Sequence, residues 1–66
     1  MTVKYPNVHV NLVGEDGNAF AILGRVMKAM RRADVDPAEI KAFQQEATGG
    51  DYDRLLQTCM RWVDCR

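Results

Sequence analysis

The chain has 66 residues, which is enough for one small domain and too short for two. Apolar residues make up 47% of it and charged residues 27%, as in folded proteins, so disorder is excluded as the default state. Nine Lys and Arg balance nine Asp and Glu, so the chain lacks a strong overall positive charge. This argues against a protein that binds nucleic acid independently of sequence. We therefore expect one folded domain whose function depends on local groups of charges.

No segment has the composition of a membrane span or of a secretory leader. The longest apolar run, Ala19–Leu23, is far shorter than the roughly 20 residues that cross a bilayer. The opening stretch, Met1–Val10, lacks the apolar core of a signal peptide. We therefore expect a cytoplasmic protein that does not engage a membrane.

Alternating residues near the start of the chain predict a β-strand. Apolar and polar side chains alternate at Val8, His9, Val10, Asn11 and Leu12. A period of two is typical of a strand with one buried face, so we place this strand at about residues 7–13. The turn-forming residues 14–18 follow and predict a change of direction.

Residues 19–33 are predicted to form the first helix, with Asn18 as its N-cap. Placed every 100°, its apolar side chains gather on one side, and they are Ala19, Phe20, Ile22, Leu23, Val26, Met27, Ala29, Met30 and Ala33. The alternative is a hairpin in which Ala19–Leu23 is a second strand, because Asp16-Gly17 is a common hairpin turn. The regular helical partition favours the helix.

Two further helices follow, each preceded by a capping residue. Asp36-Pro37-Ala38-Glu39 predicts a helix of about eleven residues that starts at Pro37, with Asp36 accepting from the N–H of Glu39 and the Glu39 side chain reaching back. Asp51 then caps a third helix that we expect to run nearly to the end of the chain. The apolar stripe of this helix consists of Tyr52, Leu55, Leu56, Cys59, Trp62 and Val63.

Together these elements predict an α+β, mainly helical fold, in which one N-terminal strand precedes three helices in a single domain, residues 1–66. The strand has no partner in this arrangement, and an unpaired edge leaves backbone groups unsatisfied. Three completions are open: a hairpin with part of Met1–Tyr5, a hairpin with Ala19–Leu23, or pairing with the same strand of a second copy. The last of these predicts a homodimer.

Positive charge gathers on the polar side of the first predicted helix. Its four cations are Arg25, Lys28, Arg31 and Arg32, with no acid among them, whereas residues 34–53 hold six acids and one Lys. One interpretation is a binding face for phosphate or for an acidic protein surface, because guanidinium groups fork onto pairs of oxygens. The alternative is a solvated face whose arginines pair with acids of the next helix or of a second subunit.

A strand with polar outer residues followed by helices is also the layout of ribbon-helix-helix proteins, whose paired strands enter the DNA major groove. Under this hypothesis His9 and Asn11 read base edges and Lys4 contacts a phosphate. The zero net charge and the surplus third helix weigh against it. A protein partner is therefore favoured over nucleic acid.

No pattern in the sequence predicts catalysis, a cofactor or a metal site. His9 is the only histidine and has no nucleophile near it in sequence, and together with Cys59 and Cys65 it falls short of four zinc ligands. In a continuous helix the two thiols point to different faces, beyond disulfide reach. We expect Cys59 to pack in the core and Cys65 to be an exposed thiol.

The end of the third helix offers a second candidate contact. Trp62 and Met60 lie close to the end of the chain, and we expect both to be partly exposed. An aromatic ring beside Arg61 is typical of interface anchors. Trp62 is therefore a candidate interface anchor.

Three stretches carry a resemblance to a known family, and they are Tyr5-Pro6-Asn7-Val8, Asp16-Gly17-Asn18-Ala19-Phe20-Ala21-Ile22 and Glu46-Ala47-Thr48-Gly49-Gly50-Asp51-Tyr52-Asp53. The chain resembles, over most of its length, short proteins of bacteriophages and prophage-bearing bacteria, to which no activity is assigned. The resemblance implies a phage or mobile-element origin and action in the bacterial cytoplasm. Small phage proteins without active sites commonly occupy a surface of a host machine, as anti-CRISPR inhibitors do. It thus implies a non-enzymatic protein with a macromolecular partner, and it assigns no role to any residue.

Overall fold

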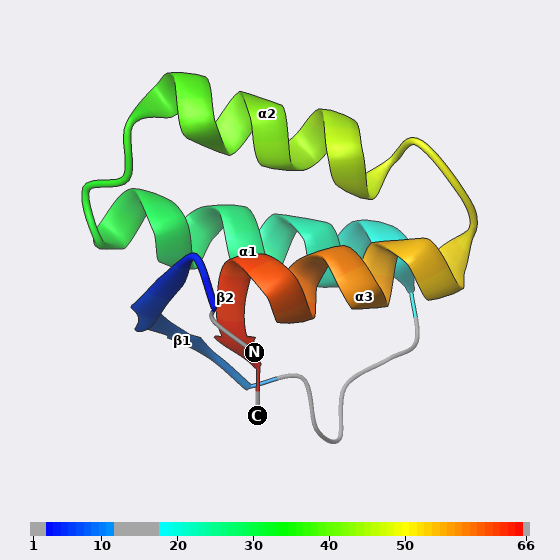
Figure 1. Cartoon of the computed structure of the whole chain (residues 1–66), viewed down its shortest axis with the longest axis horizontal. Coiled ribbons are helices and arrows are strands. Elements are labelled where there is room, and N and C mark those ends of the chain that lie inside the picture. The colour runs from blue at the N-terminus through cyan, green and yellow to red at the C-terminus, as the bar shows by residue number, and fades with distance from the viewer. Residues whose placement is uncertain (1–2, 12–17, 66) are drawn as a thin grey trace.

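The computed structural model describes residues 3–11 and 18–65, which form strands and helices in the order β-α-α-α-β (Figure 1). The elements are β1 (Tyr5–Val10), α1 (Ala19–Arg32), α2 (Pro37–Ala47), α3 (Tyr52–Trp62) and β2 (Val63–Cys65). The α+β, mainly helical fold is therefore confirmed, and Ala19–Leu23 is helical rather than a second strand. Within the described part of the chain, no helix is both long and apolar enough to cross a membrane.

Strands β1 and β2 pair in parallel, so the N-terminal strand is completed by residues from the other end of the chain. The opposed residues are Tyr5 with Val63, His9 with Asp64 and Val10 with Cys65, with an irregularity between Tyr5 and His9. None of the three predicted completions included residues 63–65, so the pairing with β2 was missed, whereas pairing with a second copy stays a prediction. Strand β1 also starts two residues before the predicted 7–13, whose last two positions lie outside the described residues.

Helix α3 ends where β2 begins, which is earlier than predicted. Val63 has an extended backbone, with φ −134° and ψ 164°, and its side chain is fully buried. A β-branched side chain suits this conformation. Cys65 consequently lies in β2 and is half-buried, so the prediction of an exposed thiol was wrong, whereas Cys59 is buried as predicted. Both cysteines are free thiols.

The three helices pack against one another on one side of the two strands (Figure 1). Helix α1 contacts α2, α3 and β1, and α2 also contacts α3. The buried apolar side chains that form the core between these elements are Val8, Val10, Ile22, Leu23, Val26, Met30, Ile40, Phe43, Ala47, Leu55, Cys59, Trp62 and Val63. The core thus draws on every element, which fixes α1 against β1 along the strand.

Each helix begins at its predicted N-cap. In each helix a backbone N–H donates to a side-chain oxygen of the N-cap residue at 2.9 Å. The donors and acceptors are Phe20 and Asn18, Ala38 and Asp36, and Arg54 and Asp51. Such bonds satisfy N–H groups that a helix leaves unpaired in its first turn. The starts of the helices are therefore set by local contacts.

The capping box predicted at the start of α2 is not formed. The Asp36 side chain accepts from the N–H of Ala38 rather than from that of Glu39. The carboxylate of Glu39 instead binds Lys4 and Tyr5 at the start of β1. A charged partner from a distant part of the chain has taken the place of the local backbone contact.

Candidate functional site

An open groove of about 670 Å³ runs between β1 and α1. Residues 7–11 form one wall of this groove. The other wall is one face of α1, which runs back past the strand (Figure 1) and contributes Ala21, Gly24, Arg25, Lys28, Ala29, Arg32 and Ala33. The groove thus runs along β1 from Asn7 onward, as far as Asn11 just after the strand.

The helical period explains which residues of α1 face the groove. Ala21, Gly24, Lys28 and Arg32 are three or four positions apart, so they lie in one row along the helix. The first two are small and leave the groove open at that end. The other two are long, exposed cations. The same helix face therefore supplies both space and charge.

Of the cations that line the groove among the described residues, Arg25 is bonded to the strand, whereas Lys28 and Arg32 are not. Arg25 donates from Nη1 to the main-chain oxygen of Asn11 at 2.9 Å, which ties α1 to the end of the strand. Lys28 and Arg32 form no side-chain hydrogen bond or ion pair with any residue in 3–11 or 18–65. The groove therefore carries positive charge that the described residues do not neutralise.

Arg31 lies apart from the other three cations of the predicted basic face. It lines a separate depression between α1 and α2, together with Asp34, Lys41 and Gln44. Like Lys28 and Arg32, it makes no ion pair with the described residues, so the predicted pairing with acids of the next helix is not seen for these three side chains. The structure divides one sequence-predicted face into two surfaces.

The two residues predicted to read DNA lie in the same groove as the cations. His9 is exposed, and its Nδ1 is 2.8 Å from Oδ2 of Asp64, the residue opposite it in β2. Sequence reasoning treated the strand and the basic helix face as separate sites, since a linear pattern does not show that residues 7–11 face α1. Sequence reasoning also missed Asn7 and Gly24 as groove residues. Asn7 carries no signal in the sequence, and the only signal for Gly24 is that glycine is unusual inside a helix.

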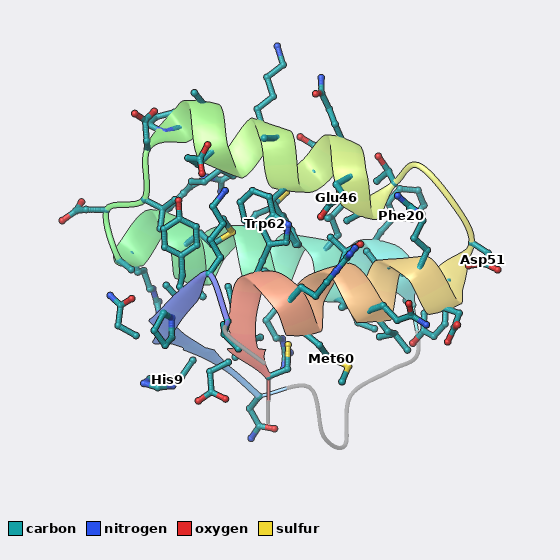
Figure 2. The ribbon with its side chains drawn as sticks, viewed as in Figure 1. His9, Phe20, Glu46, Asp51, Met60 and Trp62 are labelled. Atoms are coloured by element: carbon teal, nitrogen blue, oxygen red, sulfur yellow. The ribbon has the colours of Figure 1, made fainter. Side chains whose placement is uncertain are left out.

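A second group of polar side chains, which we call the Trp62 cluster, joins β1, α2 and α3. The indole Nε1–H of Trp62 donates to Oε2 of Glu46 at 2.6 Å, and the two side chains face each other in Figure 2. The indole ring packs edge-on against Phe43 at 5.6 Å and stacks with Tyr5 at 6.1 Å between centroids. The Nζ of Lys4 lies 4.2 Å from the centroid of the same ring, within range of a cation–π contact. Residues of β1 and α2, together with Lys4, thus enclose Trp62.

Glu39 is the carboxylate that completes the Trp62 cluster. Its Oε1 lies 2.8 Å from Nζ of Lys4 and accepts a hydrogen bond from the Tyr5 hydroxyl at 3.0 Å. The bond to Lys4, and after it the bond to Tyr5, hold the pKa of Glu39 below its usual value. The bond between Lys4 and Glu39 also raises the pKa of Lys4. Burial, followed by the bond to Glu39, raises the pKa of Tyr5. Lys4 is therefore engaged within the fold.

Exposure of the large apolar side chains differs from the prediction at three positions, and one of them is Tyr52, which is exposed although it was assigned to the apolar stripe of α3. Trp62 is only 8% exposed, so the prediction of a partly exposed ring was wrong, whereas Met60 is exposed as predicted. Phe20 is 82% exposed although it was assigned to the buried side of α1. Its position lies about 100° around the helix from the middle of the buried row, which explains the difference. Phe20 and Tyr52 border a small groove of about 210 Å³.

The thiols have little nucleophilic character. Burial raises the pKa of Cys59 to about 12 and also raises the pKa of Cys65. Both therefore stay protonated at neutral pH, and the thiolate is the reactive form. Among residues 3–11 and 18–65, no group of three His, Cys, Asp or Glu side chains is placed to hold a metal ion.

Comparison with known proteins found no matching family model, no matching curated protein and no matching solved structure. The function is therefore inferred from the groove itself.

Proposed function

We propose that this is a non-enzymatic binding protein that engages an acidic partner protein through the groove between β1 and α1. The observation that carries the proposal is the pair Lys28 and Arg32, which line the groove and have no ionic partner within the described residues. Cations placed this way bind carboxylates, and the planar guanidinium can hold both carboxylate oxygens. The partner supplies the negative charge that the described residues do not.

The resemblance to short phage and prophage proteins supports a bacterial setting for this binding. In that setting the protein acts in the bacterial cytoplasm and occupies a surface of a host machine, in the manner of an anti-CRISPR inhibitor. The zero net charge suits this role, because binding then depends on one local patch rather than on long-range attraction to any polyanion.

A protein partner fits the charges around the groove better than DNA does. Affinity for duplex DNA relies on many neutralised phosphates, whereas the groove offers few cations and has Asp64 bonded to the imidazole of His9. In addition, β1 pairs in parallel with β2 of its own chain, whereas the ribbon of a ribbon-helix-helix protein joins strands of two chains. The DNA-binding dimer is kept as an outcome of the tests.

The first test compares two double charge reversals of equal size. Immobilised wild type, Lys28→Glu/Arg32→Glu and Arg31→Glu/Lys41→Glu are each exposed to nuclease-treated bacterial lysate, and retained proteins are quantified by mass spectrometry. We expect one acidic protein to be retained by the wild type and by the second variant, which alters charges outside the groove, and to be lost from the first. Equal retention by all three proteins contradicts the proposal.

The second test measures solution mass by light-scattering chromatography, with and without a short DNA duplex at low salt. We expect the solution mass of the protein to be the same with and without the DNA duplex. A dimer that shifts onto DNA, and that His9→Ala or Asn11→Ala prevents from shifting, replaces the protein partner with the DNA-binding alternative. The same measurement decides the predicted homodimer.

A further inference from the structure

We infer that the groove takes its partner as an extended acidic segment, which lies alongside β1 as a third strand of the sheet. This inference rests on the proposed function and adds the form of the ligand. The segment is a peptide in β conformation with acidic side chains at alternate positions. Three features of the groove lead to it: the open side of the sheet, the spacing of the cations and the glycine in α1.

Among the described residues the sheet has two strands, so one edge of β1 has no paired strand, and the groove runs along β1. β1 pairs with β2, and within residues 3–11 and 18–65 no further strand joins the sheet. The groove follows the consecutive residues 7–11, so its length matches an extended chain of about five residues, or about 17 Å. Partner peptides commonly bind by adding a strand at such a sheet edge, with pockets beside the strand selecting alternate side chains.

The spacing of the two unneutralised cations matches the repeat of an extended chain. Lys28 and Arg32 are four residues apart, which corresponds to a rise of about 6 Å along α1. Side chains on one face of a β-strand repeat every second residue, at about 6.8 Å. Two carboxylates at positions i and i+2 of a bound strand can therefore each face one of these cations.

Gly24 gives the bound segment room to approach α1. Glycine inside a helix is unfavourable relative to alanine, so a reason for its presence is expected. Packing within the described chain does not supply one, because a Cβ at Gly24 would meet no atom within 4 Å. Gly24 lines the groove opposite the strand, in the row that includes Lys28 and Arg32. A methyl group at this position would narrow the space that the segment occupies.

The test uses a labelled synthetic peptide of about eight residues in which Glu alternates with Thr, measured by fluorescence anisotropy. We expect it to bind the wild type, and to bind Lys28→Glu/Arg32→Glu about tenfold or more weakly. Arg31→Glu/Lys41→Glu is expected to change the affinity by less than about twofold, since its charges lie outside the groove. Circular dichroism establishes that each variant is folded, and Gly24→Ala, which is expected to fold at least as well, should also weaken binding.

Backbone methylation of the peptide tests the strand geometry directly. Two peptides carry N-methyl groups on alternate residues, one set on the odd and the other on the even positions. Since successive N–H groups of a strand point to opposite edges, we expect one set to abolish binding and the other to leave it nearly unchanged. Equal affinity of both methylated peptides overturns the third-strand arrangement.

Two further outcomes separate this inference from the proposed function. If no acidic peptide binds while the lysate test still yields a groove-dependent partner, the extended-segment inference is wrong and the proposed function stands. If an oligothymidylate binds through Lys28 and Arg32 and no acidic peptide does, both are wrong and the groove is a nucleic-acid site.

Discussion

The groove follows residues 7–11, whereas the Trp62 cluster meets the start of β1 at Lys4 and Tyr5, and the two regions use positive charge in opposite ways. In the cluster, Lys4 is bonded to Glu39, and Arg61 lies 3.8 Å from Glu46. In the groove, Lys28 and Arg32 face no acid of the described chain. Cations in the cluster therefore belong to the fold, whereas Lys28 and Arg32 form no ion pair within the described residues and are the ones that the proposed function uses. The difference separates residues that stabilise the protein from residues to which we assign the proposed binding.

Apolar burial, more than ion pairing, gives the Trp62 cluster its stability. Its ion pairs are substantially exposed, so solvent screens the charges and the pairs contribute little to stability. The indole ring, in contrast, is almost fully buried between Tyr5 and Phe43. We therefore rank the following changes by how much of this burial they remove.

The largest effect is expected from Trp62→Ala. Removing the ring leaves a cavity and unpairs Glu46 from its donor, so the free energy of unfolding should fall by about 3–5 kcal/mol. Urea titration followed by circular dichroism measures this change. The matched control is Met60→Ala, two residues earlier on the exposed side of α3, which should change stability by less than about 0.5 kcal/mol. Similar losses in both variants would show that Trp62 has no special place in the core.

A smaller effect, which depends on pH, is expected from Glu39→Gln. The pKa of Glu39 in the folded protein lies below its ordinary value of 4.5, so its carboxylate stabilises the fold fully above pH 4.5. This contribution is lost as the pH falls through the lowered pKa. The melting temperature of Glu39→Gln should therefore be lower than that of the wild type at pH 7, and the gap should shrink in acid. When Lys4 is also replaced by Met, the difference in melting temperature caused by Glu39→Gln should already be smaller at pH 7. A difference that stays constant with pH contradicts a stabilising role for the Glu39 carboxylate.

Gly24→Ala sharpens the comparison because it should affect stability and binding in opposite directions. Alanine in a helix is more favourable than glycine by about 0.5–1 kcal/mol, and the added methyl group meets no atom of the described chain. We expect a rise of about this size in the free energy of unfolding, measured by urea titration. A loss of stability would show that α1 needs glycine for its own packing.

The smallest effect on stability is expected from Lys28→Ala/Arg32→Ala. These side chains are exposed and make no side-chain contact within the described residues, so the free energy of unfolding should change by less than about 0.5 kcal/mol. Partner capture from lysate should nevertheless be lost. A destabilised variant would instead assign these cations to the fold, as in the Trp62 cluster.

The helices were predictable because their signals are local. Asn18, Asp36 and Asp51 each bond a backbone N–H two or three residues away, so a short stretch of sequence contains the whole interaction. The same applies to the buried row of α1, which follows from the helical period. At the site, the period also predicted which cations share the polar side of α1. It did not separate Arg31 from the other three, since that depends on which neighbouring element each side chain faces.

The sequence by itself determined where the three helices begin, the presence of a strand near residue 8 and the concentration of cations on one helix. Only the tertiary structure decided that residues 63–65 follow α3 as a strand that pairs with β1, and that β1 and α2 enclose Trp62. It also decided that His9, Asn11 and the groove cations share one surface. The physical reason is the range of the interactions. A helix is stabilised by bonds between residues four apart, whereas His9 meets Asp64 only when the ends of the chain come together in the folded protein.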